Sequence, residues 1–204
     1  MPLTYASGFQ PDGSYQPNKY FMRQALELGE PCADYGDHPV GAVVTAVGSF
    51  SGAERLEALG LGATTEREFI VGRGQNEVHR SGDPTAHADI IALRQASIEV
   101  GRHTLSRCVM YTSHECCPMC AGAIANTSLA GVVYATSIED IEGLLQDRPD
   151  TKWRSNNIRM ATILGGRRES GAAMPFIIGG FMREEGLALL GKTLNSAAGL
   201  PANR

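Results

Sequence analysis

The sequence has no uninterrupted apolar run of about 18 residues, the length that a membrane-spanning helix needs. Its beginning lacks the basic stretch and apolar segment of a secretory signal. It also lacks an excess of positive charge, since 18 Lys and Arg stand against 22 Asp and Glu. Binding to nucleic acid depends largely on neutralising phosphates. We therefore expect a cytoplasmic protein without membrane contact, and a small molecule rather than a nucleic acid as its partner.

The composition also argues against extensive disorder, with 43% hydrophobic and 20% charged residues in 204. This length corresponds to one domain. The first 17 residues hold three prolines and show no periodicity. We predict an irregular arm over residues 1–17 and a single domain over residues 18–204.

Short apolar segments alternate with segments of helical periodicity along the chain. The segment VGAVVTAV is nearly all apolar and β-branched, which predicts a strand buried on both faces. This alternation favours a three-layer α/β/α domain whose sheet is covered by helices on both sides. The expected strands are 40–47, 68–74, 108–113 and 131–136, and the expected helices include 85–100, one from 118, and one within 175–192. An insertion near residues 48–67 is expected to enlarge a hairpin.

Two further helix starts carry capping signals. Asn18 is an N-cap candidate, and Ser137 with Asp140 has the spacing of a weakened capping box. The helix after Asn18 is expected to bury one stripe, formed by Tyr20, Phe21, Ala25 and Leu28.

The five cysteines are unevenly distributed, because three of them fall within five positions. An odd number of cysteines without an export signal indicates metal binding or catalysis rather than disulfides. Cys117 and Cys120 stand at the start of an expected helix, where residues three apart share one face. Cys32 and Cys108 are interpreted as small buried hydrophobic residues.

His87 offers a third ligand, also near a helix start. Zinc binds sulfur and imidazole in a tetrahedron, and three protein ligands leave one position for a water whose pKa falls to about 7. The alternative is a closed structural site with Cys116 as fourth ligand. Adjacent cysteines point in divergent directions, so this alternative is disfavoured.

Asp89 follows the histidine by two positions, within the segment TAHAD. A carboxylate close to the metal can carry a proton from bound water to a leaving amine. The alternative is an acidic residue that only favours the helix N-terminus. The nearby His87 and cysteine pair favour the catalytic interpretation.

These motifs together resemble those of the cytidine deaminase superfamily. The resemblance rests on residues 39–43, 72–76, 85–89 and 111–124, which read PVGAV, GRGQN, TAHAD and YTSHECCPMCAGAI. It covers about residues 18–145 and is closest to the nucleoside and guanine deaminases and the tRNA adenosine deaminases. Zinc base deaminases share a His-x-Glu and a Pro-Cys-x-x-Cys motif, with the glutamate as acid/base.

The resemblance implies a cytidine-deaminase-like fold with a mixed central sheet, one Zn²⁺ per chain and a homodimer. It implies His87, Cys117 and Cys120 as zinc ligands and Asp89 as proton shuttle. It also implies that Asn76 binds the substrate ring, although an asparagine after a strand is often a turn residue.

The chain departs from the family pattern twice: Asp89 replaces the glutamate, and Cys116 replaces the proline before the first ligand cysteine. The shorter acid retracts the carboxylate by about 1.5 Å unless the helix moves closer. Three outcomes follow, in order of preference: a site adapted to aspartate, a slow enzyme, or an inert zinc protein.

The function predicted is hydrolytic deamination of a small amino-heterocycle, a nucleobase or nucleoside resembling guanine or cytosine. A tRNA adenosine deaminase is the alternative, weakened by the acidic charge balance. The C-terminal segment 146–204 diverges most and is expected to help close the pocket. The candidates for pocket closure lie within residues 137–181 and are polar or aromatic residues that more often serve packing or solvation: Asp140, Glu142, Asp147 and Trp153. His114 is expected to be satisfied by the backbone, and His38 to lie in a loop or at the surface.

Overall fold

The computed structural model describes residues 14–46, 70–101, 103–146, 158–166 and 174–195. Within them one sheet has the order β2-β1-β3-β4-β5. β1 pairs antiparallel with β2 and β3, whereas β3, β4 and β5 run parallel. The sheet is therefore mixed, as expected. The strands are β1 (Gly41–Ala46), β2 (Ile70–Gln75), β3 (Cys108–His114), β4 (Gly131–Thr136) and β5 (Phe176–Ile178).

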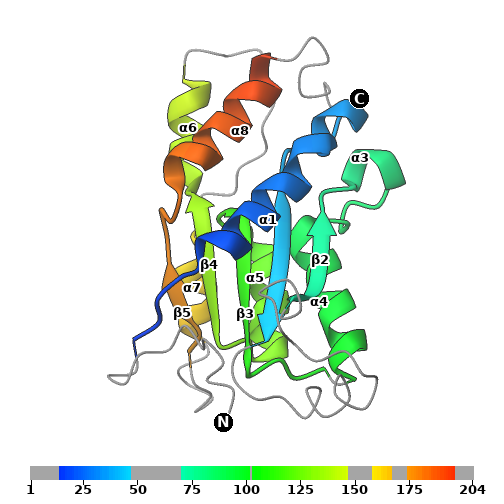
Figure 1. Ribbon diagram of the computed structural model, residues 1–204, viewed down its shortest axis with the longest axis vertical. Coiled ribbons are helices and arrows are strands. Elements are labelled where there is room, and N and C mark those ends of the chain that lie inside the picture. The colour runs from blue at the N-terminus through cyan, green and yellow to red at the C-terminus, as the bar shows by residue number, and fades with distance from the viewer. Residues whose placement is uncertain (1–13, 47–69, 102, 147–157, 167–173, 196–204) are drawn as a thin grey trace.

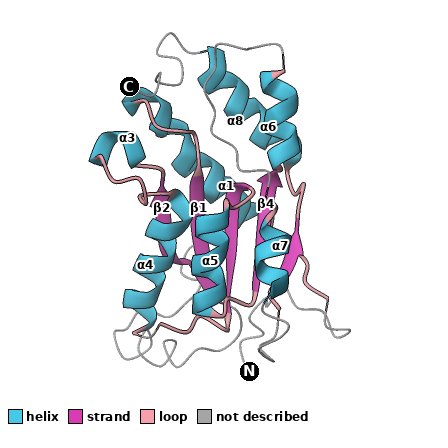
Figure 2. Cartoon of the chain, turned by 180° about the vertical axis from the view of Figure 1, so that it is seen from behind, coloured by secondary structure: helices cyan, strands magenta, loops and turns pink. Residues whose placement is uncertain are grey.

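Helices cover both faces of this sheet. α1 and α8 lie on the face turned to the viewer in Figure 1, and α4, α5 and α7 lie on the opposite face in Figure 2. This arrangement confirms the three-layer α/β/α fold. The helical elements are α1 (Lys19–Gly29), the 3₁₀ helix η1 (Glu30–Tyr35), α3 (Val78–Ser81), α4 (Ala88–Val100), α5 (Pro118–Thr127), α6 (Ile138–Leu145), α7 (Met160–Gly165) and α8 (Arg183–Asn195).

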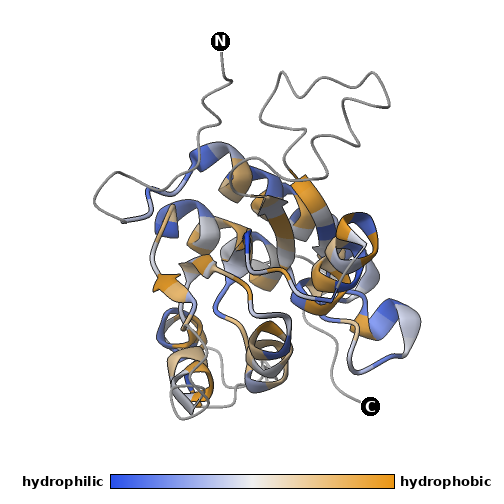
Figure 3. Cartoon of the chain, turned by 90° about the horizontal axis from the view of Figure 1, so that it is seen from below, coloured by the Kyte–Doolittle hydropathy of each residue, from blue (hydrophilic) through white to orange (hydrophobic). Residues whose placement is uncertain are grey.

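The two helix layers enclose two hydrophobic clusters, one on each side of the strands. β3 and β4 are buried along nearly their whole length, and β1 is buried on both faces as predicted. β2 instead alternates between buried and half-buried residues, as an edge strand does. Figure 3 shows the hydrophobic stretches of the strands between the helices.

Both capping predictions are confirmed. The Asn18 side chain accepts a hydrogen bond from the backbone N–H of Tyr20 at 2.8 Å, and Ser137 with Asp140 forms a capping box. The buried stripe of α1 is displaced by one residue from the expected one, because Tyr20 and Leu28 are half-buried. Its buried members are Phe21, Met22, Ala25, Leu26 and Gly29.

α4 packs unusually close to β2. A side chain at Gly72 or Gly74 would overlap the carbonyl oxygens of Ala92 and Ala88, so only glycine permits this approach. α4 begins at Ala88 rather than at residue 85, which makes His87 its N-cap instead of a residue of the first turn. The close packing sets the N-terminus of α4 at the edge of the sheet where β3 ends.

Several predictions fall outside the described residues: arm residues 1–13, the insertion at 48–67, Asp147 and Trp153. α3 and α7 were not predicted, and α7 lies within the divergent C-terminal segment. None of the described helices combines the length and apolarity that crossing a membrane would take.

Candidate metal and catalytic site

Three predicted ligands meet where the N-termini of α4 and α5 come together. His87 is the N-cap of α4, Cys117 is the N-cap of α5, and Cys120 lies in the first turn of α5. His87 Nδ1 is 3.6 Å from each sulfur, and the two sulfurs are 3.6 Å apart. These three residues could hold a metal ion.

The local sequence explains why the three side chains converge. Pro118 occupies the first turn of α5, where its missing N–H is not needed, and Cys117 keeps an extended backbone before it. The N-terminal dipoles of both helices favour negative charge at this point. The pKa of Cys117 falls to about 4, mainly through its hydrogen bond with Cys120 and also through that with His87.

The other two members of the cluster titrate in the opposite sense. The hydrogen bond with Cys117 raises the pKa of the His87 imidazole, and the same neighbour raises the pKa of Cys120. The Cys117 thiolate is therefore favoured beside a protonated His87 and a protonated Cys120. A thiolate is the form of cysteine that binds metal.

Asp89 lies in the first turn of α4 and is only 4% exposed. Burial raises the pKa of its carboxyl, and its neighbours include Cys120, Thr112 and His87. Its Oδ1 atom is buried without a hydrogen-bond partner in the described part of the chain. An acid that only served the helix N-terminus would be solvated. This burial beside the cluster instead supports a chemical role.

Asn76 is buried at the end of β2. Its Oδ1 accepts a hydrogen bond from the backbone N–H of Val78 at 3.4 Å, so the expected turn role is present. The next residue, Glu77, donates its N–H to Ala86 O at 2.9 Å, which ties this turn to the segment before His87. Asn76 thus belongs to the same edge of the sheet as the metal cluster.

Cys116 is 1% exposed and is not part of the cluster that could hold a metal. Burial raises the pKa of its thiol, and the nearby Asp89 carboxylate raises it further. The arrangement gives no support to Cys116 as a fourth ligand.

Two more histidines lie beside the cluster. His114 Nδ1 lies 3.1 Å from Thr136 O, as expected for a histidine satisfied by the backbone. His38 lies in a loop, as predicted, and is half-buried. Burial lowers the pKa of each to about 4, and His87 contributes to the shift of His38. Both imidazoles are therefore neutral at pH 7.

The acidic residues considered for pocket closure have other roles where they are described. Asp140 caps α6 together with Ser137 and accepts from Arg183 Nη2 at 2.6 Å. Glu142 is exposed. Both observations favour the packing and solvation alternative for these residues.

Sequence reasoning missed an ion pair next to the cysteines, between a buried carboxylate and a partly exposed arginine. The Glu115 side chain is 2% exposed and accepts from Arg159 Nε at 2.7 Å. The same carboxylate accepts from the backbone N–H groups of Met160 at 3.2 Å and Ile138 at 3.4 Å. A glutamate directly before the cysteine motif was the available signal, but its partner lies 44 residues further on.

Comparison with known proteins agrees with the site. The model of the MafB19-like deaminase family matches residues 17–167. Guanine deaminase of Bacillus subtilis is 46% identical over 71 residues, covering 35% of this chain and 46% of that protein. tRNA-specific adenosine deaminase of Buchnera aphidicola is 30% identical over 125 residues, covering 61% of this chain and 70% of that protein.

A third relative is a longer protein. tRNA(Ile)-lysidine synthase of Deinococcus radiodurans is 34% identical over 158 residues, covering 74% of this chain. The chain thus spans only 22% of the synthase and 46% of the Bacillus enzyme.

Solved structures share the fold. The guanine deaminase of Nitrosomonas europaea superimposes with a TM-score of 0.63 at 24% identity, over 87% of this chain and 84% of that one. A protein solved in complex with 2,6-diaminopurine gives a TM-score of 0.62 at 25% identity, over 90% of this chain and 84% of that one. The solved structures show that the chain has the cytidine-deaminase fold, and the family match over residues 17–167 establishes that it belongs to the MafB19-like deaminase family.

Proposed function

We propose that the chain is a zinc-dependent deaminase that releases ammonia from a small amino-heterocycle. The observation that carries this proposal is the triangle of His87, Cys117 and Cys120 with sides of 3.6 Å. A tetrahedral zinc with bonds of about 2.3 Å to sulfur and about 2.1 Å to nitrogen spaces its ligand atoms about 3.6–3.8 Å apart. The donor set and its spacing therefore fit zinc, with one ion per chain.

When bound, zinc supplies a water of lowered pKa at its fourth position. We assign the proton transfers to Asp89, whose carboxyl would take a proton from the attacking water and return it to the leaving ammonia. Its burial raises the pKa of the carboxyl, which helps it to hold the proton between these two transfers. Oδ1, which is buried and has no hydrogen-bond partner among the described residues, is the atom that we assign to this transfer.

We infer that the substrate is a free base of the guanine type. The Bacillus relative and the Nitrosomonas structure are guanine deaminases, and 2,6-diaminopurine is also a free base. Asn76, buried at the same edge, is assigned to a hydrogen bond with the substrate ring. Its Oδ1 is held by Val78, which leaves the side-chain NH₂ as the group for that role.

Metal analysis and an ammonia assay test this function together. Purified protein is expected to contain about one zinc per chain and to release ammonia from guanine in preference to guanosine, cytidine and adenosine. The screen includes pterins and triazines, which carry the same amidine-type carbon. Protein that held no transition metal after growth with added zinc would contradict the proposal.

A tRNA adenosine deaminase is the second candidate, favoured by the Buchnera relative. The net charge of −4 leaves it without the overall positive charge that phosphate binding draws on. A gel-shift titration with tRNA at 50 and 200 mM salt separates the two candidates. We expect no retardation at either salt concentration.

An inert zinc protein is the third possibility, because Asp89 is one methylene shorter than the family's glutamate. We expect turnover, and we expect Asp89→Ala to lower kcat by about 10²- to 10⁴-fold while zinc content stays the same. Wild-type protein that bound zinc but released no ammonia from any compound of the screen would favour the inert alternative.

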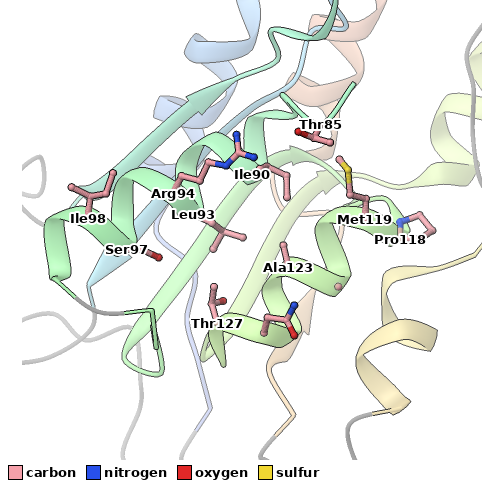
Figure 4. Close-up of a pocket in the computed structure, with 12 residues that line it drawn as sticks. Thr85, Ile90, Leu93, Arg94, Ser97, Ile98, Pro118, Met119, Ala123 and Thr127 are labelled. Carbon is pink, nitrogen blue, oxygen red and sulfur yellow. The ribbon is translucent and has the colours of Figure 1, made fainter. Parts of the chain in front are cut away.

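We further propose that two chains associate through the outer surface of α4 and α5. A groove of about 900 Å³ lies there, lined mainly by apolar side chains (Figure 4). Ile98 at its rim is 81% exposed and Met119 37%. Ile98→Asp is expected to shift sedimentation from dimer to monomer. Ile158→Asp, at an exposed isoleucine outside the groove, is the matched control.

A further inference from the structure

The carboxylate of Glu115 joins three segments of the chain just before the cysteine motif. Its Oε1 atom accepts from Arg159 Nε at 2.7 Å and from the backbone N–H of Met160 at 3.2 Å. Its Oε2 atom accepts from the N–H of Ile138 at 3.4 Å. Ile138 and Met160 are the first residues of α6 and α7, of which α7 lies beside α5 in Figure 2. Both oxygens are thus held by groups from outside the loop that carries them.

Arg159 is itself held by two further partners. Its guanidinium binds the Glu139 carboxylate, and its Nη2 donates to the Tyr134 hydroxyl at 3.3 Å. Glu139 lies on α6, and Tyr134 lies on β4. A planar guanidinium is pre-organised, so it loses little freedom for each hydrogen bond that it forms. It therefore offers Glu115 a donor in a fixed place.

The backbone of Glu115 is fixed as well. Its N–H donates to Thr136 O at 2.8 Å, which continues the pairing of β3 with β4 beyond His114. Only Cys116 separates Glu115 from Cys117, so the Cα atoms of these two residues lie within about 7 Å of each other. Cys117 is the N-cap of α5 and has an extended backbone. A displacement of Glu115 would therefore reach Cys117 over a very short segment.

A purely apolar contact would hold this loop less specifically. The Glu115 side chain is 2% exposed, and a carboxylate in such a place is costly unless its oxygens are paired. Hydrogen bonds weaken steeply when their angles change, so three of them hold the carboxylate in one position. Apolar packing carries no such directional requirement. The cost of the buried charge is therefore offset by a defined position of the loop.

We propose that Glu115 is a positioning residue: its carboxylate, held by Arg159 and by the first N–H groups of α6 and α7, fixes the turn that presents the Cys117 sulfur to the metal ion. The proposal rests on the proposed function, since it takes the cluster of His87, Cys117 and Cys120 to be the metal site. Glu115 acts through Cys117, because it is not among the described residues that could hold the metal.

Alkylation of thiols in metal-free protein tests the turn without the metal. In wild type the Cys117 sulfur lies 3.6 Å from His87 Nδ1 and from the Cys120 sulfur. Glu115→Ala releases the turn, so Cys117 should react with iodoacetamide about 10-fold faster, the factor expected for loss of a charge-assisted hydrogen bond. Cys108, buried in β3, is the internal standard, because a general loss of stability would raise both rates.

Glu115→Gln is the conservative variant, and it serves if Glu115→Ala does not fold. Its amide oxygen can still accept from Arg159 and Met160, but its NH₂ group turns a donor toward the N–H of Ile138. We expect its Cys117 alkylation rate to rise by about threefold relative to Cys108, between wild type and Glu115→Ala. A rate ratio equal to that of wild type in both variants would overturn the proposal.

Co²⁺ in place of zinc reports the geometry of the loaded site, since its visible absorption depends on how its ligands are arranged. Glu115→Ala is expected to shift the absorption bands and to weaken Co²⁺ binding about 10-fold. Glu115→Gln should recover most of the wild-type spectrum. A merely structural role would lower stability and leave the bands of the folded protein unchanged.

Glu139→Gln is the matched control. Glu139 binds the same arginine as Glu115, but its side chain is 59% exposed and lies on α6. We expect wild-type alkylation of Cys117 and a wild-type Co²⁺ spectrum from this variant. If it behaved like Glu115→Ala, the charge around Arg159 rather than the turn at Glu115 would be responsible, and the proposal would be wrong.

The two readouts separate this proposal from the proposed function. Wild type that bound neither zinc nor Co²⁺ would contradict the proposed function, and the alkylation rates would then decide alone on the turn. In a wild type that binds metal, equal rises of the Cys117 and Cys108 rates in Glu115→Ala would refute the positioning role. The proposed function would stand in that case.

Discussion

The side of the sheet that carries the His87, Cys117 and Cys120 cluster and the C-terminal segment are attached to the molecule by different interactions. α4 and α5 bury apolar residues in the cluster behind β1, β3 and β4. α6 and α7 are linked to the sheet end by the polar groups of Glu115, while α8 is linked to α6 by the Arg183–Asp140 ion pair. α7 also buries Met160 and Leu164 in that cluster, and α8 buries Leu189 in the other one. Apolar burial therefore holds the ligands, whereas apolar burial and directional hydrogen bonds together hold the elements around them.

This difference has a consequence for function. The triangle of His87, Cys117 and Cys120 is formed at the starts of α4 and α5. We therefore expect it to tolerate substitutions away from these helix starts. The C-terminal elements depend on a few polar contacts in addition to apolar burial, so a single substitution of a polar partner is expected to weaken their attachment. Substitutions in the cluster are therefore expected to change zinc content and activity, whereas substitutions in the C-terminal elements are expected to change stability and local unfolding.

The largest effect is expected from loss of a ligand. Cys117→Ala removes one corner of the triangle, so zinc content should fall to background. Ammonia release should fall by more than the roughly 10- to 100-fold that a supporting residue contributes. Removal of zinc by a chelator should reproduce this loss in wild type. Cys32→Ala, at a buried cysteine outside the cluster, is the control and should keep both zinc and activity.

The next largest effect is expected where the two sides are joined. Glu115→Ala leaves Arg159 and two backbone N–H groups without their carboxylate, which should lower the free energy of unfolding by about 2–4 kcal/mol. The exposed pair offers the comparison: Arg183→Ala should change the free energy of unfolding little, since that arginine side chain is 48% exposed. Equal losses in urea unfolding would refute the distinction between the two attachments.

The same contrast explains how far the sequence could be interpreted. Strand 131–136, the cap at Ser137 and the ligand set follow from patterns within a few residues, or from motifs matched as a unit. Arg159 could not be predicted, because its partner is 44 residues away and no periodicity links them. The alternation in β2 and the shift of the α1 stripe depend on which elements pack against them, which local patterns do not specify.

The histidines beside the cluster give a smaller, pH-dependent effect. Burial lowers the pKa of His38 and of His114 to about 4 in the folded chain, whereas an unfolded histidine titrates near 6.5. The unfolded state therefore binds more protons between these values, and stability should fall as the pH drops through this window. His87 contributes in the opposite sense, because its pKa is raised.

In zinc-free protein, we expect His114→Asn to flatten this decline by about 2 kcal/mol between pH 7 and pH 4.5. Unfolding by urea across this pH range measures it. His79→Asn, at an exposed histidine, should leave the slope unchanged. If the unfolding free energy of His114→Asn had the same pH dependence as that of wild type, groups other than His114 would take up the protons.

The smallest effect tests whether the C-terminal segment opens separately. Asn18 and Ser137 are both N-caps whose side chains accept a backbone hydrogen bond, and each substitution by alanine should cost about 1 kcal/mol. α1 is packed on the sheet by five buried residues, so its loss should show in global unfolding. α6 buries only Ile138 and Ile141, so Ser137→Ala should instead speed amide exchange within α6 with less change in global stability. If both variants lowered global stability equally, with no local increase in amide exchange, α6 would unfold together with the elements that carry the His87, Cys117 and Cys120 cluster.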